Sequence, residues 1–133
     1  MSQENVEIVR KSSEALNTGG IEAALPFFAE DVLVYPTSEW PDADVYRGHD
    51  GYRGLYHAWT GNFDDWSWEV HEIRDLGSRV LSLGEMKGRM KGSDVRISEA
   101  WGVVSSDFRN GKAGEVRFFR SQQQALKAVG LAE

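Results

Sequence analysis

One stretch of the sequence, residues 95–108, alternates in polarity and carries a carboxylate on its apolar side. In an extended strand Ile97, Glu99, Trp101 and Val103 share one face. A carboxyl group among apolar side chains loses hydration, which raises its pKa and suits it to general acid or base chemistry near neutral pH. Glu99 is therefore the predicted catalytic residue, unless a bulge turns it to solvent or into an ion pair.

Aromatic side chains are the second set of candidates. The chain has five Trp, four Tyr and six Phe, spread over most of the predicted elements. If several of them converge, they predict a pocket for a flat, largely apolar ligand, oriented by tyrosine hydroxyls and indole N–H groups. The alternative is an ordinary hydrophobic core. The predicted ligand-binding residues are Tyr35, Trp40, Tyr56, Trp59, Trp101 and Phe119.

Other kinds of site find no support in the residue types. The chain contains no cysteine, which excludes a disulfide framework, a zinc–thiolate centre and a cysteine nucleophile. His49, His57 and His71 are scattered and show no metal-ligand spacing. No phosphate loop, dinucleotide fingerprint or Ser-His-Asp arrangement is present. We expect no metal and no cofactor.

Composition and charge limit the classes of partner that the protein is expected to bind. With 133 residues the chain fits one domain, residues 1–133, and its net charge of −6 argues against a polyanionic partner. Its longest basic stretch, residues 87–91, is short, so nucleic acid is not expected. No apolar run approaches the roughly 20 residues of a membrane span, and the first ten residues lack the core of a signal peptide. The expected partner is a small hydrophobic molecule, and the expected location is cytoplasmic.

The first half of the chain predicts three helices. The first begins after Ser2 and ends at residues 17–20, the second runs from Ile21 to about Phe28, and Asp50 opens the third. Apolar residues of the third helix recur at helical spacing, at positions 52, 55, 56 and 59.

The second half of the chain predicts long strands. A short strand at residues 32–35 precedes four hairpin-linked strands and a terminal helix at residues 122–129; the four strands cover residues 66–75, 79–90, 95–108 and 115–120. Strands of this length must twist and bend. The order predicts an α+β fold, a cone-shaped curved antiparallel sheet with three N-terminal helices packed on its concave face.

Six short segments, spread along nearly the whole chain, together form a recognisable pattern: residues 15–19, 28–32, 46–51, 76–80, 108–112 and 125–131. In their order and spacing they resemble the nuclear-transport-factor-2-like superfamily, and within it the SnoaL-like branch, which is similar to polyketide cyclases and ketosteroid isomerases. The resemblance implies a cone with a pocket and a homodimer formed through the convex face of the sheet. The superfamily includes isomerases, cyclases, hydrolases and members that only bind, so the reaction must be argued from the lining of the pocket.

The ketosteroid-isomerase chemistry does not carry over onto this sequence. The catalytic Asp of that family precedes the proline that ends the first strand, where this chain has Tyr35. Its helix tyrosine corresponds to Ser12, and its protonated Asp to Val104 or Ser105. Without a carboxylate at these positions, no general base is available to remove a proton next to a carbonyl group. Epoxide hydrolases of this fold use an Asp-Arg-Asp set, for which Glu85, Glu99 and Arg117 remain an open alternative.

The sequence thus predicts a protein that binds a small hydrophobic or polycyclic molecule, with or without cofactor-independent acid–base catalysis of the isomerase, cyclase or hydrolase type. The alternative is a non-catalytic ligand sensor or a dimeric interaction module. For the homodimer, the small side chains of Ala100, Gly102, Val104 and Ser106 predict the contact face.

Overall fold

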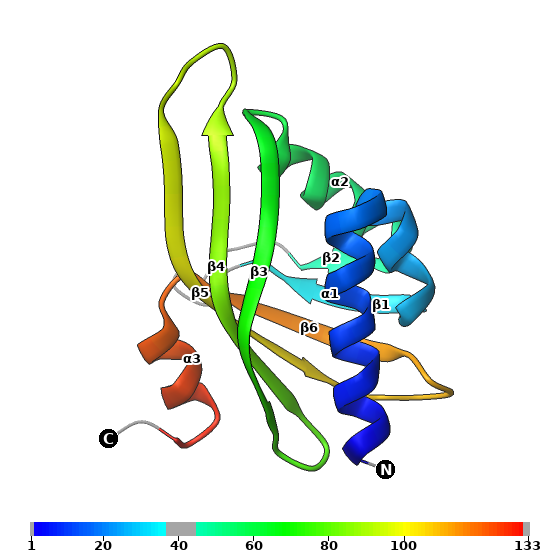
Figure 1. The fold of residues 1–133 in the computed structure, drawn as a ribbon. Helices are drawn as coiled ribbons and strands as arrows, with labels where there is room; N and C mark the ends of the chain where they lie inside the picture. Colours follow the sequence, from blue (N-terminus) through cyan, green and yellow to red (C-terminus); the bar gives the residue numbers. More distant parts are fainter. Residues whose placement is uncertain (1, 37–44, 132–133) are drawn as a thin grey trace.

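The computed structural model describes residues 2–36 and 45–131, which form helices on both sides of one curved sheet (Figure 1). Helix α1 (Ser2–Ala24) and the short 3-10 helix η1 (Leu25–Phe27) precede the first strands, and α2 (Gly48–Thr60) precedes the long ones. Helix α3 (Gln122–Ala128) ends the described chain. The predicted α+β class is confirmed.

Gly20 bends the first helix. Its φ of 73° and ψ of −165° are not helical, and they interrupt α1 at the place where the sequence predicts the end of one helix and the start of another. A residue without Cβ adopts such a φ at little cost. Pro26 then confines the next turn to η1, which leads directly into the first strand.

Six strands form a single sheet in the order β2-β1-β6-β5-β4-β3. Their bounds are β1 Phe28–Tyr35, β2 Tyr46–Arg47, β3 Phe63–Asp75, β4 Val80–Met90, β5 Arg96–Ser106 and β6 Ala113–Phe119. The four hairpin-linked strands pair antiparallel as predicted, and so do β1 and β2, but β1 pairs parallel with β6, so the sheet as a whole is mixed. The two-residue strand β2 was not predicted.

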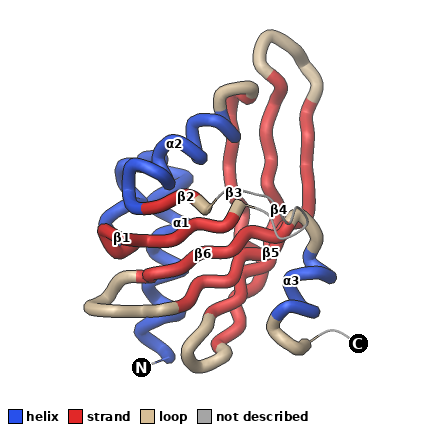
Figure 2. Tube along the Cα trace, turned by 180° about the vertical axis from the view of Figure 1, so that it is seen from behind, coloured by secondary structure: helices blue, strands red, loops and turns tan. Residues whose placement is uncertain are grey.

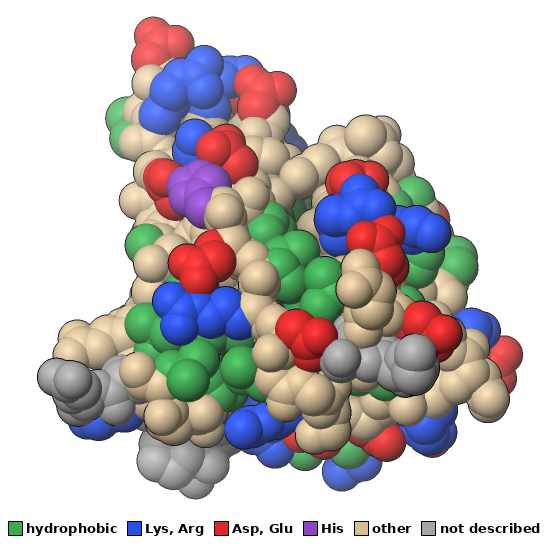
Figure 3. Space-filling model, turned by 60° about the horizontal axis from the view of Figure 1, so that its bottom comes forward, with side chains coloured by type: hydrophobic (Ala, Val, Ile, Leu, Met, Phe, Trp, Pro, Cys, Tyr) green, Lys and Arg blue, Asp and Glu red, His purple; other side chains and the backbone are tan. Residues whose placement is uncertain are grey.

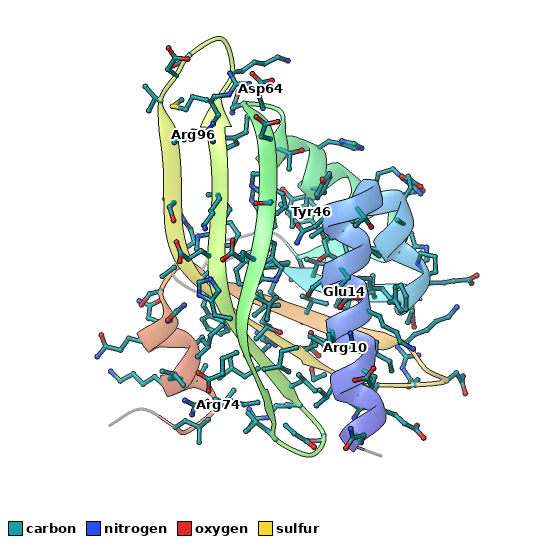
Figure 4. The ribbon with its side chains drawn as sticks, viewed as in Figure 1. Arg10, Glu14, Tyr46, Asp64, Arg74 and Arg96 are labelled. Atoms are coloured by element: carbon teal, nitrogen blue, oxygen red, sulfur yellow. The ribbon has the colours of Figure 1, made fainter. Side chains whose placement is uncertain are left out.

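Breaks in register bend the long strands. The pairing of β3 with β4 shifts between Asp64 and Ser67 and again between Val70 and Glu72. Next to the second shift, a Cβ on Gly84 would lie 2.0 Å from the carbonyl oxygen of Glu69, so only glycine permits this close approach. The turn between β4 and β5 projects beyond α2 (Figure 1). Asp64 and Arg74 lie at opposite ends of β3 (Figure 4).

The two faces of the sheet carry separate hydrophobic clusters. The inner face, which bears Trp101, Val103 and Phe118, packs against α1 and α2 in the larger cluster. The outer face bears Val104 and Phe119, and there the smaller cluster includes Ala125 of α3. Strands β1, β6 and β5 lie in front of α1 when the molecule is seen from behind (Figure 2). The sheet therefore separates α3 from the N-terminal helices.

Helix α3 covers part of the face predicted for dimer contacts. A Cβ on Gly102 would lie 2.3 Å from Cβ of Ala125, and Val104 is buried in the cluster that contains α3. The predicted contact face is therefore occupied within the chain itself at Gly102 and Val104, whereas Ala100 is exposed. The homodimer stays a prediction.

Charged side chains of both signs lie beside each other on the surface, with hydrophobic patches between them (Figure 3). On α1, for example, Arg10 contacts Glu14 at 2.8 Å. None of the helices in the described parts of the chain is both long and apolar enough to cross a membrane.

Candidate functional site

A cavity of about 50 Å³ lies between the inner face and the helices α1 and α2. Its wall includes all the tryptophans of the described residues, Trp59 of α2, Trp66 and Trp68 of β3, and Trp101 of β5. The volume exceeds the roughly 10–15 Å³ that one water requires but is below the about 150 Å³ of an engineered cavity that binds benzene. An aromatic ligand therefore requires side chains of the wall to move.

Edge-to-face contacts hold the aromatic wall together. The ring centroid of Trp59 lies 5.5 Å from that of Trp101 and 4.8 Å from that of Phe118. Tyr56 contacts Trp66 in the same way, at 5.6 Å. Such pairs contribute about 0.5–1.5 kcal/mol beyond the burial of their area. The wall is a packed surface in which each ring positions the next.

Apart from the indole N–H groups of the tryptophans, the polar side-chain groups in the wall are hydroxyls. Ser12, Ser82 and Ser105 are buried and line the cavity, together with the partly buried Tyr56. Burial raises the pKa of the Tyr56 hydroxyl above its usual value of 10.0, so this group is neutral at pH 7. Among the described residues that line the cavity there is no Asp, Glu, His, Lys or Arg. The wall can donate and accept hydrogen bonds but offers no charge.

A second hollow adjoins the cavity on the same side of the sheet, the inner face, and is called the outer groove below. It is lined by Phe63, Met86, Ile97, Glu99 and Arg120 and shares Trp59, Trp66 and Trp101 with the cavity. Its volume is about 350 Å³. The three shared tryptophans therefore form the boundary between the outer groove and the cavity.

Glu99 lies in the outer groove and not in the cavity. Its face of β5 is the predicted one, but its carboxylate accepts hydrogen bonds from Trp101 Nε1 at 2.9 Å and from Arg120 Nη2 at 3.1 Å. The Trp101 bond first, and the Arg120 guanidinium with it, hold the pKa of Glu99 below its usual 4.5. The expected rise in pKa is wrong, because these partners outweigh desolvation in a side chain that is 33% exposed.

The structure brings three of the six predicted ligand-binding residues to the cavity, namely Tyr56, Trp59 and Trp101. Phe119 faces α3 on the opposite side of the sheet, and Phe118 takes the place predicted for it. Tyr35 is paired in register with Arg117, whose guanidinium lies 3.9 Å from the centre of the Tyr35 ring. Trp40 lies outside the described residues.

The alternative carboxylate–arginine set is not assembled. Glu85 accepts a hydrogen bond from Ser98 Oγ at 2.5 Å, and Arg117 contacts Glu115 at 2.8 Å. The pairing of β4 with β5 puts Glu85 on the outer face, whereas Glu99 is on the inner face. Arg117 is likewise on the outer face, since it pairs with Val104. These side chains cannot act on one bound molecule.

The positions that correspond to the catalytic residues of ketosteroid isomerases are also not brought together. Ser12 and Ser105 line the cavity, whereas Tyr35 lies on the other face of the sheet. Ser82 and Trp68 are among the cavity residues that the sequence did not predict. Ser82 could have been found from its place between apolar neighbours at positions 80, 81 and 83, but the bulges in β3 hide the orientation of Trp68 from any alternation pattern.

The histidines lie apart from the cavity. His49 Nε2 lies 2.9 Å from the carbonyl oxygen of Phe28, and His71 Nε2 lies 2.9 Å from Glu69 on the surface. Within residues 2–36 and 45–131, no three His, Asp or Glu side chains are grouped so that they could hold a metal ion.

A family model described as a SnoaL-like domain matches residues 9–116. No curated protein matches the chain in sequence.

Solved structures match over most of their length. An NTF2-like protein of unknown function from Burkholderia pseudomallei K96243 is 18% identical, with a TM-score of 0.75 over 96% of this chain and 98% of its own. An NTF2-like protein from Burkholderia xenovorans LB400 is 29% identical, with a TM-score of 0.67 over 87% and 88%. TerC, co-crystallised with polyporic acid, is 16% identical, with a TM-score of 0.74 over 95% and 98%.

Proposed function

The chain belongs to the family of SnoaL-like domains, and we propose that it binds a small, neutral, largely apolar molecule in the cavity and the adjoining outer groove. The observation that carries the proposal is the wall of the cavity, which is aromatic, aliphatic and hydroxylated and holds no charge among the described residues. Ligand sites of this kind take their affinity from apolar burial and their orientation from a few polar groups. TerC, which has the same fold, was co-crystallised with polyporic acid, which supports small-molecule binding by this fold.

Binding without acid–base chemistry is the form of the proposal that the site favours. An ionised ligand inside the cavity would lose its hydration and gain no opposite charge from the described wall. The nearest carboxylate of the outer groove, Glu99, is paired with Arg120 and has a lowered pKa, which suits neither a general acid nor a base near neutral pH.

Two fluorinated probes with the same rings test the proposal. 2-Fluoronaphthalene is neutral, and 6-fluoro-2-naphthoate adds one negative charge. In a ¹⁹F NMR titration at pH 7 we expect saturable binding of the first and none of the second. Binding of 2-fluoronaphthalene should also change the tryptophan fluorescence, because four tryptophans surround the cavity. If 2-fluoronaphthalene does not saturate, or if naphthoate binds equally well, the proposal fails.

A further inference from the structure

A serine hydroxyl in the wall of the cavity has no hydrogen-bond partner among the described residues. It belongs to Ser82, whose side chain is 1% exposed. A buried hydroxyl without a partner costs free energy that an alanine at the same position would avoid. By contrast, Ser12 Oγ in the same wall donates to the carbonyl oxygen of Val9 at 2.9 Å. Ser82 Oγ is therefore a fully buried hydroxyl in the wall of this cavity without a partner among the described residues.

The pairing of β4 with β5 puts Ser82 on the cavity side of the tryptophan boundary. Along β4, Met86 pairs with Glu99 in the outer groove, and Gly84 pairs with Trp101 at the boundary. Ser82 comes two residues further along the same face and belongs to the cavity alone. A ligand that passes the tryptophans would therefore reach the Ser82 hydroxyl on the cavity side of the boundary.

We propose that Ser82 is the hydrogen-bonding anchor of the site and selects neutral, planar molecules that carry a hydroxyl or carbonyl oxygen at their buried end. The inference rests on the proposed function, since it names the class of ligand for the same cavity. The serine hydroxyl can donate to either oxygen and can also accept from a hydroxyl. A carboxylate would satisfy it too, but its charge would be buried in a wall that offers no cation among the described residues.

The strand geometry also gives the length of the ligand. At roughly 3.3 Å per residue, Ser82 lies about 13 Å along β4 from Met86. A rigid planar molecule that is anchored at Ser82 and reaches the outer groove therefore has roughly the length of two or three fused rings. The tryptophans of the boundary would lie against the faces and edges of these rings.

The test compares 6-fluoro-2-naphthol with 2-fluoronaphthalene, which differ only in the hydroxyl group. With the wild-type protein, ¹⁹F NMR titrations should give about tenfold tighter binding of the naphthol, corresponding to roughly 1.4 kcal/mol. In Ser82→Ala this advantage should shrink to less than about twofold, while the affinity for 2-fluoronaphthalene is kept. The melting temperature of unliganded Ser82→Ala should equal or exceed that of the wild type, because the variant no longer buries an unpaired hydroxyl.

Ser98→Ala is the matched control. Ser98 is exposed on the outer face, where its hydroxyl donates to Glu85, so the same substitution there should leave the naphthol advantage at its wild-type value. A crystal structure of the naphthol complex should put the ligand oxygen roughly 2.7 Å from Ser82 Oγ.

The outcomes separate this inference from the proposed function. Equal affinities of the two probes for the wild type would overturn the role of Ser82 while the cavity remains a binding site. A naphthol advantage that persists in Ser82→Ala would overturn it as well. If neither probe shows saturable binding, the proposed function itself is wrong. If Ser82→Ala does not fold, the crystal structure of the naphthol complex with the wild type decides the question, and a ligand oxygen that lies away from Ser82 Oγ would overturn the inference.

Discussion

The side-chain amide of Asn17 pairs with the backbone of Trp68 as a neighbouring strand would. The Trp68 N–H donates to Asn17 Oδ1 at 2.9 Å, and Asn17 Nδ2 donates to the Trp68 carbonyl oxygen at 2.6 Å. Strand β3 is at the edge of the sheet, where backbone groups have no further strand to bond. Through this pair, α1 is attached to the sheet beside the cavity that Trp68 lines.

Asn17→Ala should weaken this attachment. Both hydrogen bonds to Trp68 are lost, and we expect the free energy of unfolding to fall by about 1–3 kcal/mol in urea denaturation. Hydrogen exchange of the Trp68 amide should accelerate as well. Thr18→Ala is the control, because Thr18 Oγ1 donates to the carbonyl oxygens of Glu14 and Ala15 on the exposed side of its own helix, and its effect should stay within about 0.5 kcal/mol. Similar losses in both variants would contradict a specific role for Asn17.

Two glycine substitutions should act in opposite directions. Gly102→Ala puts a Cβ 2.3 Å from Cβ of Ala125, so α3 must shift, and overpacking of this kind costs about 1–3 kcal/mol. Gly54→Ala lies on the exposed side of α2 with nothing within 4 Å of the new Cβ, and it should stabilise the protein by about 0.5–1 kcal/mol. Thermal unfolding measures both, and hydrogen exchange should show faster opening of α3 only in Gly102→Ala.

Local patterns predict the site well where a strand is regular. Strand β5 pairs with β4 without a break in register, and its alternation correctly put Trp101 and Val103 on the inner face. In β6 the adjacent Phe118 and Phe119 are both buried, one on each side of the sheet. Since both residues are equally apolar, alternation could not say which one lines the cavity.

Contacts between distant segments explain the other differences. The lowered pKa of Glu99 depends in part on Arg120, which is 21 positions away in the sequence and reaches Glu99 only once β6 and β5 have paired. The parallel pairing of β1 with β6 likewise depends on the order of strands in the sheet, which periodicity within one strand does not encode.

The Glu99 carboxylate should make a small, pH-dependent contribution to stability. Its pKa is lowered in the folded state, so the contribution is present above the ordinary value of 4.5 and is lost as the pH falls through the folded pKa. At pH 7, Glu99→Gln should be less stable than the wild type by less than about 1 kcal/mol, because the pair with Arg120 is partly exposed. Urea unfolding at pH 3 should show little difference. A difference of the same size at both pH values would contradict this origin.

The homodimer prediction concerns the outer face beside α3. Light scattering at micromolar concentration should report about twice the chain mass of 14.9 kDa. Ala100 is exposed there and lies opposite Glu85 in the pairing of β5 with β4. Ala100→Glu would add a second carboxylate next to Glu85, and like charges across a contact should convert the dimer to monomers while circular dichroism stays unchanged. A measured wild-type mass of 14.9 kDa, that of a single chain, would contradict the homodimer.

Phe118 and Phe119 offer the strictest test of where the ligand binds. They are adjacent in sequence and similarly buried, at 8% and 4% exposure, but only Phe118 lines the cavity. Replacing either residue with leucine removes a ring from a packed cluster, so both variants should lose stability by about 1–3 kcal/mol in urea denaturation. Only Phe118→Leu should change the affinity for 2-fluoronaphthalene, because Trp59 loses its edge-to-face neighbour at 4.8 Å. Phe119→Leu, which alters the contacts beneath α3, should bind the probe as the wild type does. Equal changes in affinity would mean that binding follows overall stability and that the inner face does not hold the ligand.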